Sequence, residues 1–232
     1  MKTKESGILD LRYFGSIIRE DFDYASDADI LCIVTDKAAA DLNGISKLLD
    51  SALVTDREID LSVYGADRIS EMYKEGHLFA WHIYLQSKPI TGHLNFLENL
   101  GVPGEYTKAK IDIENLIKIV QDSHLSLMDD SCSPVYEAGL LYVASRNIGI
   151  SASWKSSNGL DFSRHAPYSL ILNGQDKGLP LKKSEYAMLC ESRHASTRGV
   201  YPPSITREQC IAICEIVIRW AKEVLEEIKV SL

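Results

Sequence analysis

Apolar and polar positions change their pattern along the chain near residue 100. Before that point, short apolar runs typical of strands alternate with stretches of helical periodicity. We expect strands at residues 29–34 and 58–64, a helix at 37–51, a further helix within 66–87, and a short extended piece at 88–90. This alternation predicts a small sheet with flanking helices.

The expected strand at 58–64 has a regular two-residue alternation. One side carries apolar residues, namely Ile59, Leu61 and Val63. The other side carries Asp60, Ser62 and Tyr64. Because successive side chains point to opposite faces of a sheet, we expect the first set to face a core and the second to be free for polar chemistry.

A loop separates this part from a mainly helical second part. Gly101, Pro103 and Gly104 fall within four residues, which is typical of a loop. Helical stripes follow at 113–127 and 135–147, and Thr206 with Gln209 fits a capping box that begins a last helix after Pro202-Pro203. We therefore predict an α+β fold, with a catalytic domain at 1–102 and a helical bundle at 103–232.

Composition narrows the class of protein. The 232 residues include 33 acidic and 25 basic side chains, a formal charge of −8, which disfavours stable nucleic-acid binding by phosphate neutralisation. The sequence shows no apolar run of transmembrane length and no signal-peptide pattern, so we expect a cytoplasmic protein. The five cysteines show no zinc-ligand spacing, and we expect them to be reduced and buried.

Candidate chemistry concentrates at residues 13–30. Gly15 and Ser16 form a turn that opens a short helix, where backbone amides and a hydroxyl favour phosphate binding. Asp27 and Asp29 follow at the entry to a strand, with Cα atoms about 6.6 Å apart on one face. Two adjacent carboxylates repel each other unless a cation lies between them, and magnesium bound to a nucleoside triphosphate suits this arrangement.

These residues resemble the minimal nucleotidyltransferases of the DNA polymerase beta superfamily. That family carries Gly-Ser, an arginine three residues later, and Ser-Asp-x-Asp on a strand. The positions that match its spacing are Gly15, Ser16, Arg19, Asp21, Ser26, Asp27 and Asp29. Asp60, in an apolar-Asp-apolar setting, resembles the third carboxylate of the family. The likeness covers residues 8–100 well and continues more weakly into a helical domain similar to that of aminoglycoside-type nucleotidyltransferases.

The resemblance implies a mechanism with two magnesium ions. Asp27 and Asp29 would hold the ion that grips the triphosphate, and Asp60 would join them on a second ion that activates the acceptor hydroxyl. Gly15 and Ser16 would hold the β- and γ-phosphates, and Ser26 belongs to the same nucleotide-binding set. The expected reaction moves a nucleoside monophosphate, AMP from ATP, onto the acceptor and releases pyrophosphate.

The acceptor is less determined than the reaction. The acidic charge suits a cationic small molecule, such as an aminoglycoside-like antibiotic bound in a cleft between the domains. Adenylylation of a partner protein, as by antitoxin-type members of the superfamily, and a noncatalytic nucleotide-binding module are the alternatives. The sequence leaves the oligomeric state open, including a homodimer.

Several residues keep two interpretations. Arg19 either neutralises phosphate or forms an ion pair with Glu20 or Asp23 on the helix surface. Glu137 is the candidate general base, because an acid on an otherwise apolar helix is costly; the alternatives are a surface position or an ion pair with Arg146 or another cation. Trp81 is expected in the core, with base stacking as the alternative. The basic segment 191–199 is interpreted as a solvated helix end followed by glycine, with contact to the triphosphate or an anionic acceptor as the alternative.

Overall fold

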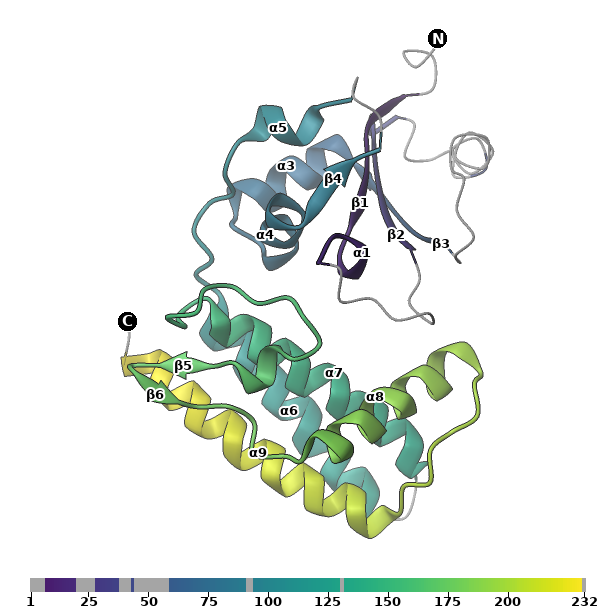
Figure 1. The fold of residues 1–232 in the computed structure, drawn as a ribbon, viewed down its shortest axis with the longest axis vertical. Helices are drawn as coiled ribbons and strands as arrows, with labels where there is room; N and C mark the ends of the chain where they lie inside the picture. The colour runs from purple at the N-terminus through teal and green to yellow at the C-terminus, as the bar shows by residue number, and fades with distance from the viewer. Residues whose placement is uncertain are drawn as a thin grey trace. The chain divides into compact units, whose positions relative to one another are not determined.

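A computed structural model describes residues 7–19, 28–37, 43, 59–90, 94–129 and 132–230. The chain divides into two compact units, Met1–Tyr106 and Thr107–Leu232 (Figure 1). The division falls in the same loop region as the boundary that the sequence predicts after residue 102. The first unit is α+β and the second is mainly helical, as the sequence predicts.

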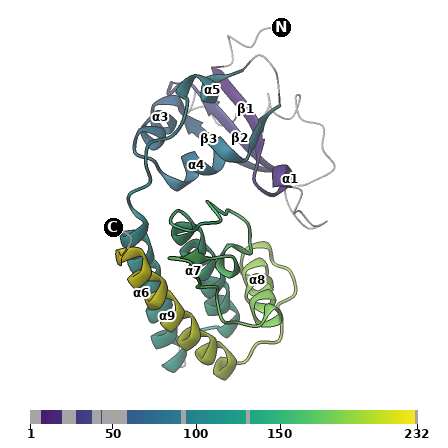
Figure 2. The same cartoon turned by 60° about the vertical axis from the view of Figure 1, so that its left-hand side comes forward.

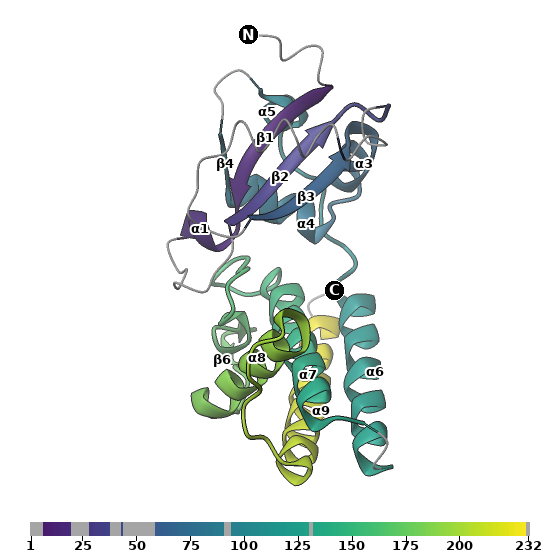
Figure 3. The ribbon, with the colours of Figure 1, turned by 90° about the vertical axis from the view of Figure 1, so that its right-hand side faces the viewer.

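The first unit is built on a mixed four-stranded sheet in the order β3-β2-β1-β4 (Figure 3). Its strands are β1 (Ile8–Phe14), β2 (Ala28–Val34), β3 (Ile59–Gly65) and β4 (Ser87–Pro89). Strand β1 is antiparallel to both β2 and β4, whereas β2 and β3 are parallel. The expected extended piece at 88–90 is therefore confirmed as the edge strand β4.

Three helices of the first unit cover one face of this sheet, namely α3 (Ala66–Lys74), α4 (Leu78–Leu85) and α5 (Phe96–Leu100). The short helix α1 (Ser16–Arg19) follows the end of β1. Leu31 and Ile33 of β2 are fully buried in a cluster with Ile69 of α3 and Ile83 of α4. Alternate residues of β2, including Ile30 and Cys32, form a second cluster on the opposite face. Strand β2 is consequently buried on both sides.

Two expectations for this unit need correction. The stretch 66–87 forms two helices rather than one, because the chain turns at Gly76, whose φ of 65° is left-handed. A Cβ at Gly76 would lie 2.2 Å from the Glu105 carbonyl oxygen, so the turn also requires glycine for space. On β3, Ile59 is 37% exposed, whereas Tyr64, expected on the free face, packs against the helix-side cluster. From Leu61 onwards, residues of β3 pack against the core clusters on both faces of the sheet. The strand is therefore exposed only at its first two residues, Ile59 and Asp60.

The second unit is a bundle of long helices (Figure 2). Its elements are α6 (Ala109–Met128), α7 (Pro134–Ser153), the short 3-10 helix η3 (Ala166–Tyr168), β5 (Ile171–Leu172), β6 (Gln175–Asp176), α8 (Lys183–Arg198) and α9 (Arg207–Val230). Helix α7 packs against α6, α8 and α9. The patterns at 113–127 and 135–147 are confirmed as parts of α6 and α7, while the hairpin β5-β6 was not expected.

The ends of two helices in this unit follow their sequence signals. The backbone amide of Thr206 donates to Gln209 Oε1 at 2.9 Å, and the Gln209 amide donates to Thr206 Oγ1 at 3.2 Å. These reciprocal bonds confirm the capping box before α9. Helix α8 ends at Arg198, and Gly199 follows in the left-handed conformation with φ of 65°, as expected for the basic segment.

The five cysteines are all free thiols, as expected. Cys32, Cys210 and Cys214 are buried, but Cys132 and Cys190 are only partly so, which corrects the expectation that all five are buried. Among the helices that the structure describes, none is long and apolar enough to span a membrane.

Candidate active site

Two of the predicted site carboxylates lie side by side at the start of the parallel pair. In the register of β2 and β3, Asp29 is the direct partner of Asp60. Paired residues of neighbouring parallel strands point to the same face, and such strands lie about 4.8 Å apart. Asp29 is half-buried and Asp60 is exposed. Residues distant in the sequence therefore bring two like charges together at one open end of the sheet.

Gly15 meets Asp29 at the end of β1. It has a φ of 74°, and a Cβ at this position would lie 2.6 Å from Asp29 Oδ2. Any larger residue would be strained in the backbone and would collide with the carboxylate. The glycine that the sequence singles out is therefore required for the Asp29 carboxylate to occupy its place.

A single residue, Gln86, holds the turn formed by Gly15 and helix α1. The backbone amide of Gly15 donates to the Gln86 carbonyl oxygen at 3.2 Å, and Arg19 Nη1 donates to Gln86 Oε1 at 2.8 Å. The Gly15 carbonyl accepts the amides of Ile18 and Arg19, which starts the helix. The amide of Gly15 is thus already used, which leaves phosphate binding to the Ser16 side of the turn.

Sequence reasoning missed Gln86 as part of this site. Neither interpretation of Arg19 included it, and the acidic residues considered as partners, Glu20 and Asp23, lie outside the described residues. Gln86 follows an apolar helix and carries no motif of its own. Its role arises only because β4 pairs with β1 and brings residue 86 beside the Gly15 turn.

Part of the predicted constellation falls outside the described residues. Asp21, Ser26 and Asp27 belong to this part, so the full ligand set stays a prediction. Within the described ranges, no three His, Cys, Asp or Glu side chains form a group suited to a metal ion. The Asp29-Asp60 pair supplies two hard oxygen ligands, and a cation between them would relieve their mutual repulsion.

Glu137 lies in the first turn of α7 and is only 5% exposed, so the surface interpretation is wrong. The proposed partner Arg146 donates instead to the Phe162 carbonyl at 2.7 Å. Glu137 lies beside Cys132. Burial raises the pKa of the Cys132 thiol, and the charge of Glu137 and a hydrogen bond to it raise that pKa further. The acid therefore sits among thiols at the end of the bundle where α7 begins.

Trp81 is half-buried, so the expectation that it lies in the core is met only in part. Its indole Nε1 donates to the Gly104 carbonyl at 2.9 Å, and its ring lies edge-on to that of Tyr84. This bond ties α4 to the loop that ends the first unit, so Trp81 has a structural role there.

Comparison with known proteins gives a structural likeness and no sequence relative. No family model matches the chain, and no curated protein matches it. Among solved structures, it is similar to the crystal structure of spectinomycin adenyltransferase AAD(9) from Enterococcus faecialis with ATP and spectinomycin. That match has a TM-score of 0.49 and 10% sequence identity, and covers 96% of this chain and 94% of the other. A likeness at this level leaves the activity to be argued from the chain's own residues.

Proposed function

We propose that this protein is a magnesium-dependent nucleotidyltransferase that moves AMP from ATP onto a hydroxyl group of a small acceptor and releases pyrophosphate. The observation that carries the proposal is the register pairing of Asp29 with Asp60. The close approach of Gly15 to Asp29 supports it, because the Gly-Ser turn and the carboxylates then belong to one site.

The residues present fit a magnesium site. Asp29 and Asp60 offer carboxylate oxygens at one end of the sheet, and Asp27 is the third ligand in the proposal. Magnesium is a hard cation that prefers such oxygens and is commonly shared with substrate phosphates. Two bound ions would neutralise the triphosphate and increase the acidity of the acceptor hydroxyl.

Side chains of the protein would bind and orient the triphosphate. The Ser16 side of the turn, together with Ser26, would hold the terminal phosphates so that the α-phosphorus faces the acceptor. The acceptor oxygen then forms a bond to the α-phosphorus, the bond to the β-phosphate oxygen breaks, and pyrophosphate leaves. Arg19, fixed by Gln86 beside the turn, would add positive charge near the triphosphate.

The proton of the acceptor hydroxyl requires a base, and Glu137 is the candidate from the helical unit. Its burial suits a base that is held away from water, whereas its contact with Cys132 offers a purely structural role. The variant Glu137→Gln distinguishes the catalytic role from the structural role. If Glu137 is the base, the variant changes the pH dependence of kcat and keeps the melting temperature. If Glu137 is structural, the variant lowers the melting temperature and keeps the pH dependence of kcat.

For the acceptor, we propose an aminoglycoside-like molecule with several hydroxyl and amino groups. The net charge of −8 supports a cationic molecule, because the field of the protein attracts it. The spectinomycin adenyltransferase with a similar structure was crystallised with ATP and spectinomycin. A hydroxyl side chain on a partner protein is the competing acceptor, and labelling distinguishes the two.

The test is an assay of pyrophosphate release with magnesium, each nucleoside triphosphate and a panel of acceptors that includes spectinomycin. We expect turnover with ATP and an amino-bearing acceptor, and its loss in Asp29→Asn. Asp122→Asn is the matched control, because Asp122 is an exposed acid on α6. Absence of turnover with every acceptor, together with equal ATP binding in Asp29→Asn, contradicts the proposal. Label that appears on a co-purified protein instead rejects the small-molecule acceptor.

A further inference from the structure

A pocket in the first unit lies apart from the carboxylate pair. It has a volume of about 310 Å³, and β1, β4 and helices α3, α4 and α5 surround it. None of Gly15, Ser16, Asp29 and Asp60 is among the described residues that line it. The proposed transfer reaction therefore assigns no role to this space.

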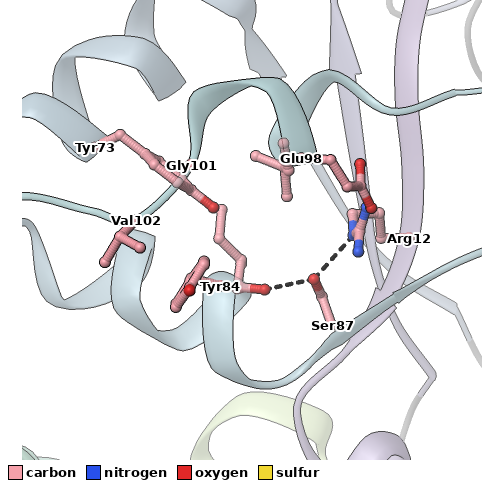
Figure 4. A pocket seen from close by; sticks show the side chains of 9 residues that line it. Arg12, Tyr73, Tyr84, Ser87, Glu98, Gly101 and Val102 are labelled. Atoms are coloured by element: carbon pink, nitrogen blue, oxygen red, sulfur yellow. Dashed lines mark hydrogen bonds and ion pairs between the residues drawn. The ribbon is translucent and has the colours of Figure 1, made fainter.

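Charged groups line one side of the pocket and are tied together. Arg12 Nη1 donates to Glu98 Oε1 at 2.6 Å and to Asp10 Oδ2 at 3.5 Å, and Arg12 Nε donates to Ser87 Oγ at 2.9 Å. Figure 4 shows Arg12, Glu98 and Ser87 facing the pocket, and the Ser87 hydroxyl donates in turn to the carbonyl of Ile83 in α4. Arg12 is held in one orientation by three partners, so this side of the pocket is preorganised.

The hydroxyl group of Tyr73 faces the same space from α3. Tyr73 is only 4% exposed, and its hydroxyl has no hydrogen-bond partner among the residues that the structure describes. In Figure 4 the hydroxyl points into the pocket. Burial raises the pKa of Tyr73 to about 12, so the group is a protonated donor at neutral pH. A buried polar group without a partner is costly, and a ligand here would satisfy it.

Charge in the pocket disfavours an anion. Arg12 is the one cation among the described lining residues, and Glu98 is the acid among them that pairs with it. Partial burial raises the pKa of Glu98, but the hydrogen bond from Arg12, a backbone hydrogen bond and the charge of Arg12 together outweigh this effect, so the pKa lies below its ordinary value. Asp10 adds a second negative charge whenever it is ionised. At neutral pH the pocket is therefore neutral or negative.

The volume of the pocket and its uncharged lining residues further restrict the kind of ligand that fits. Ligand pockets commonly enclose about 300 to 1,000 Å³, so this one lies at the small end of that range and suits a single ring. Ile83, Leu97 and Val102 add apolar surface to the charged groups, and Tyr84 adds an aromatic ring. A ring with an apolar face and several hydroxyl groups matches both kinds of surface.

We propose that this pocket binds a polyhydroxylated ring of monosaccharide size that carries no negative charge, with Tyr73, Arg12 and Glu98 contacting its hydroxyl groups. The carboxylate of Glu98, on a side chain that is 48% exposed, accepts hydrogen bonds at the rim, while Tyr73 donates from the interior. This proposal does not depend on the transfer reaction, and its tests need no catalytic activity.

The experiment is saturation-transfer difference NMR on the whole protein with myo-inositol, glucose and glucosamine, and with inorganic phosphate as the anion. We expect at least one ring probe to bind and phosphate not to compete with it. Tyr73→Phe should weaken that binding by about twofold to tenfold, the value of one hydrogen bond. The melting temperature of Tyr73→Phe without ligand should equal or exceed that of the unchanged protein, because the lost hydroxyl has no protein partner.

Tyr168→Phe is the matched control. Its hydroxyl is also buried without a partner among the described residues, but it belongs to the second unit and does not line the pocket. This variant should bind the ring probe as the unchanged protein does. Glu98→Gln should weaken binding through the rim. The proposal is overturned if no ring probe binds, if Tyr73→Phe and Tyr168→Phe bind alike, or if phosphate displaces the ring.

Discussion

Two acidic residues in the same sheet have opposite kinds of neighbour. Asp10 on β1 is fully buried, accepts the amides of Leu11 and Leu97, and pairs with Arg12. Asp29 on β2 instead has another carboxylate, Asp60, as its partner on the neighbouring strand. Asp10 thus has a cation as its neighbour. Asp29 and Asp60 instead bring two acids together at the end of the sheet where β2 and β3 begin.

The difference separates a structural acid from a functional one. The bonds of Asp10 connect β1 to the start of α5, so its charge serves the packing of the unit. The carboxylates of Asp29 and Asp60 repel each other, and a cation bound between them would relieve that repulsion. Like charges that a fold places side by side are candidates for ligand binding.

The largest effect on stability is expected at the buried acid. Arg12→Met keeps the length of the side chain but leaves Asp10 without its cation, and we expect the free energy of unfolding to fall by about 3–5 kcal/mol. Urea denaturation measures this change. Arg68→Met is the control, because Arg68 pairs with Glu71 on an exposed helix face and such a pair contributes about 0–1 kcal/mol. Equal losses in the two variants would remove the distinction between buried and exposed pairs.

A substitution in the Asp29-Asp60 pair should lower the rate of the transfer reaction without lowering the stability of the protein. Asp60→Asn removes one proposed metal ligand, and we expect kcat to fall about a hundredfold or more, which corresponds to several kcal/mol of lost transition-state stabilisation. The free energy of unfolding should stay equal or rise, because one of two like charges is gone. Steady-state kinetics and urea denaturation of the same preparation test both parts. A variant that is fully active but unstable contradicts the functional interpretation.

A smaller effect is expected at Gly15. Gly15→Ala places a side chain at φ 74° and against Asp29, so we expect a loss of about 1–2 kcal/mol in stability and a marked loss of turnover. Gly159→Ala is the control, since Gly159 has a φ of 78° with open space around it. Both variants carry the backbone cost, and only the first displaces the carboxylate. Equal activities in the two would show that the contact with Asp29 is unimportant.

Several elements of the fold could be predicted from the sequence because short local patterns mark them. Alternation along β3 places Asp60 and Ser62 on one face, and Thr206 with Gln209 marks the start of α9. The partners of these residues are not local. The pairing of Asp29 with Asp60, the role of Gln86 and the ion pair of Asp10 with Arg12 depend on strand order and register, which no short pattern encodes.

The expectations that failed have two different causes. Alternation alone cannot show where a neighbouring element ends, so it predicts Ile59 in the core although the start of β3 is open. At Gly76 the signal is local: the Gly76 amide donates to the Tyr73 carbonyl and the His77 amide donates to the Met72 carbonyl, which ends α3 in a left-handed glycine turn. The apolar periodicity on either side conceals this break.

The smallest predicted effect is the pH dependence contributed by Asp10. Burial raises the pKa of this carboxyl above its ordinary value of 3.8, and the Leu97 amide and Arg12 offset the rise only in part. The folded state then holds the proton more tightly than the unfolded state, so this contribution to stability is present below pH 3.8 and is lost as pH rises through the folded pKa. The unfolding free energy of the unchanged protein minus that of Asp10→Asn should fall over this window. A rise with pH would show that the Arg12 pair dominates.

The most direct test of the proposed site is the binding of Mn²⁺, a paramagnetic substitute for Mg²⁺, in the presence of ATP and measured by electron paramagnetic resonance. We expect Asp29→Asn and Asp60→Asn each to weaken this binding by about tenfold or more, while Asp122→Asn leaves it unchanged. The same affinity in all three variants would contradict a shared metal site at the Asp29-Asp60 pair.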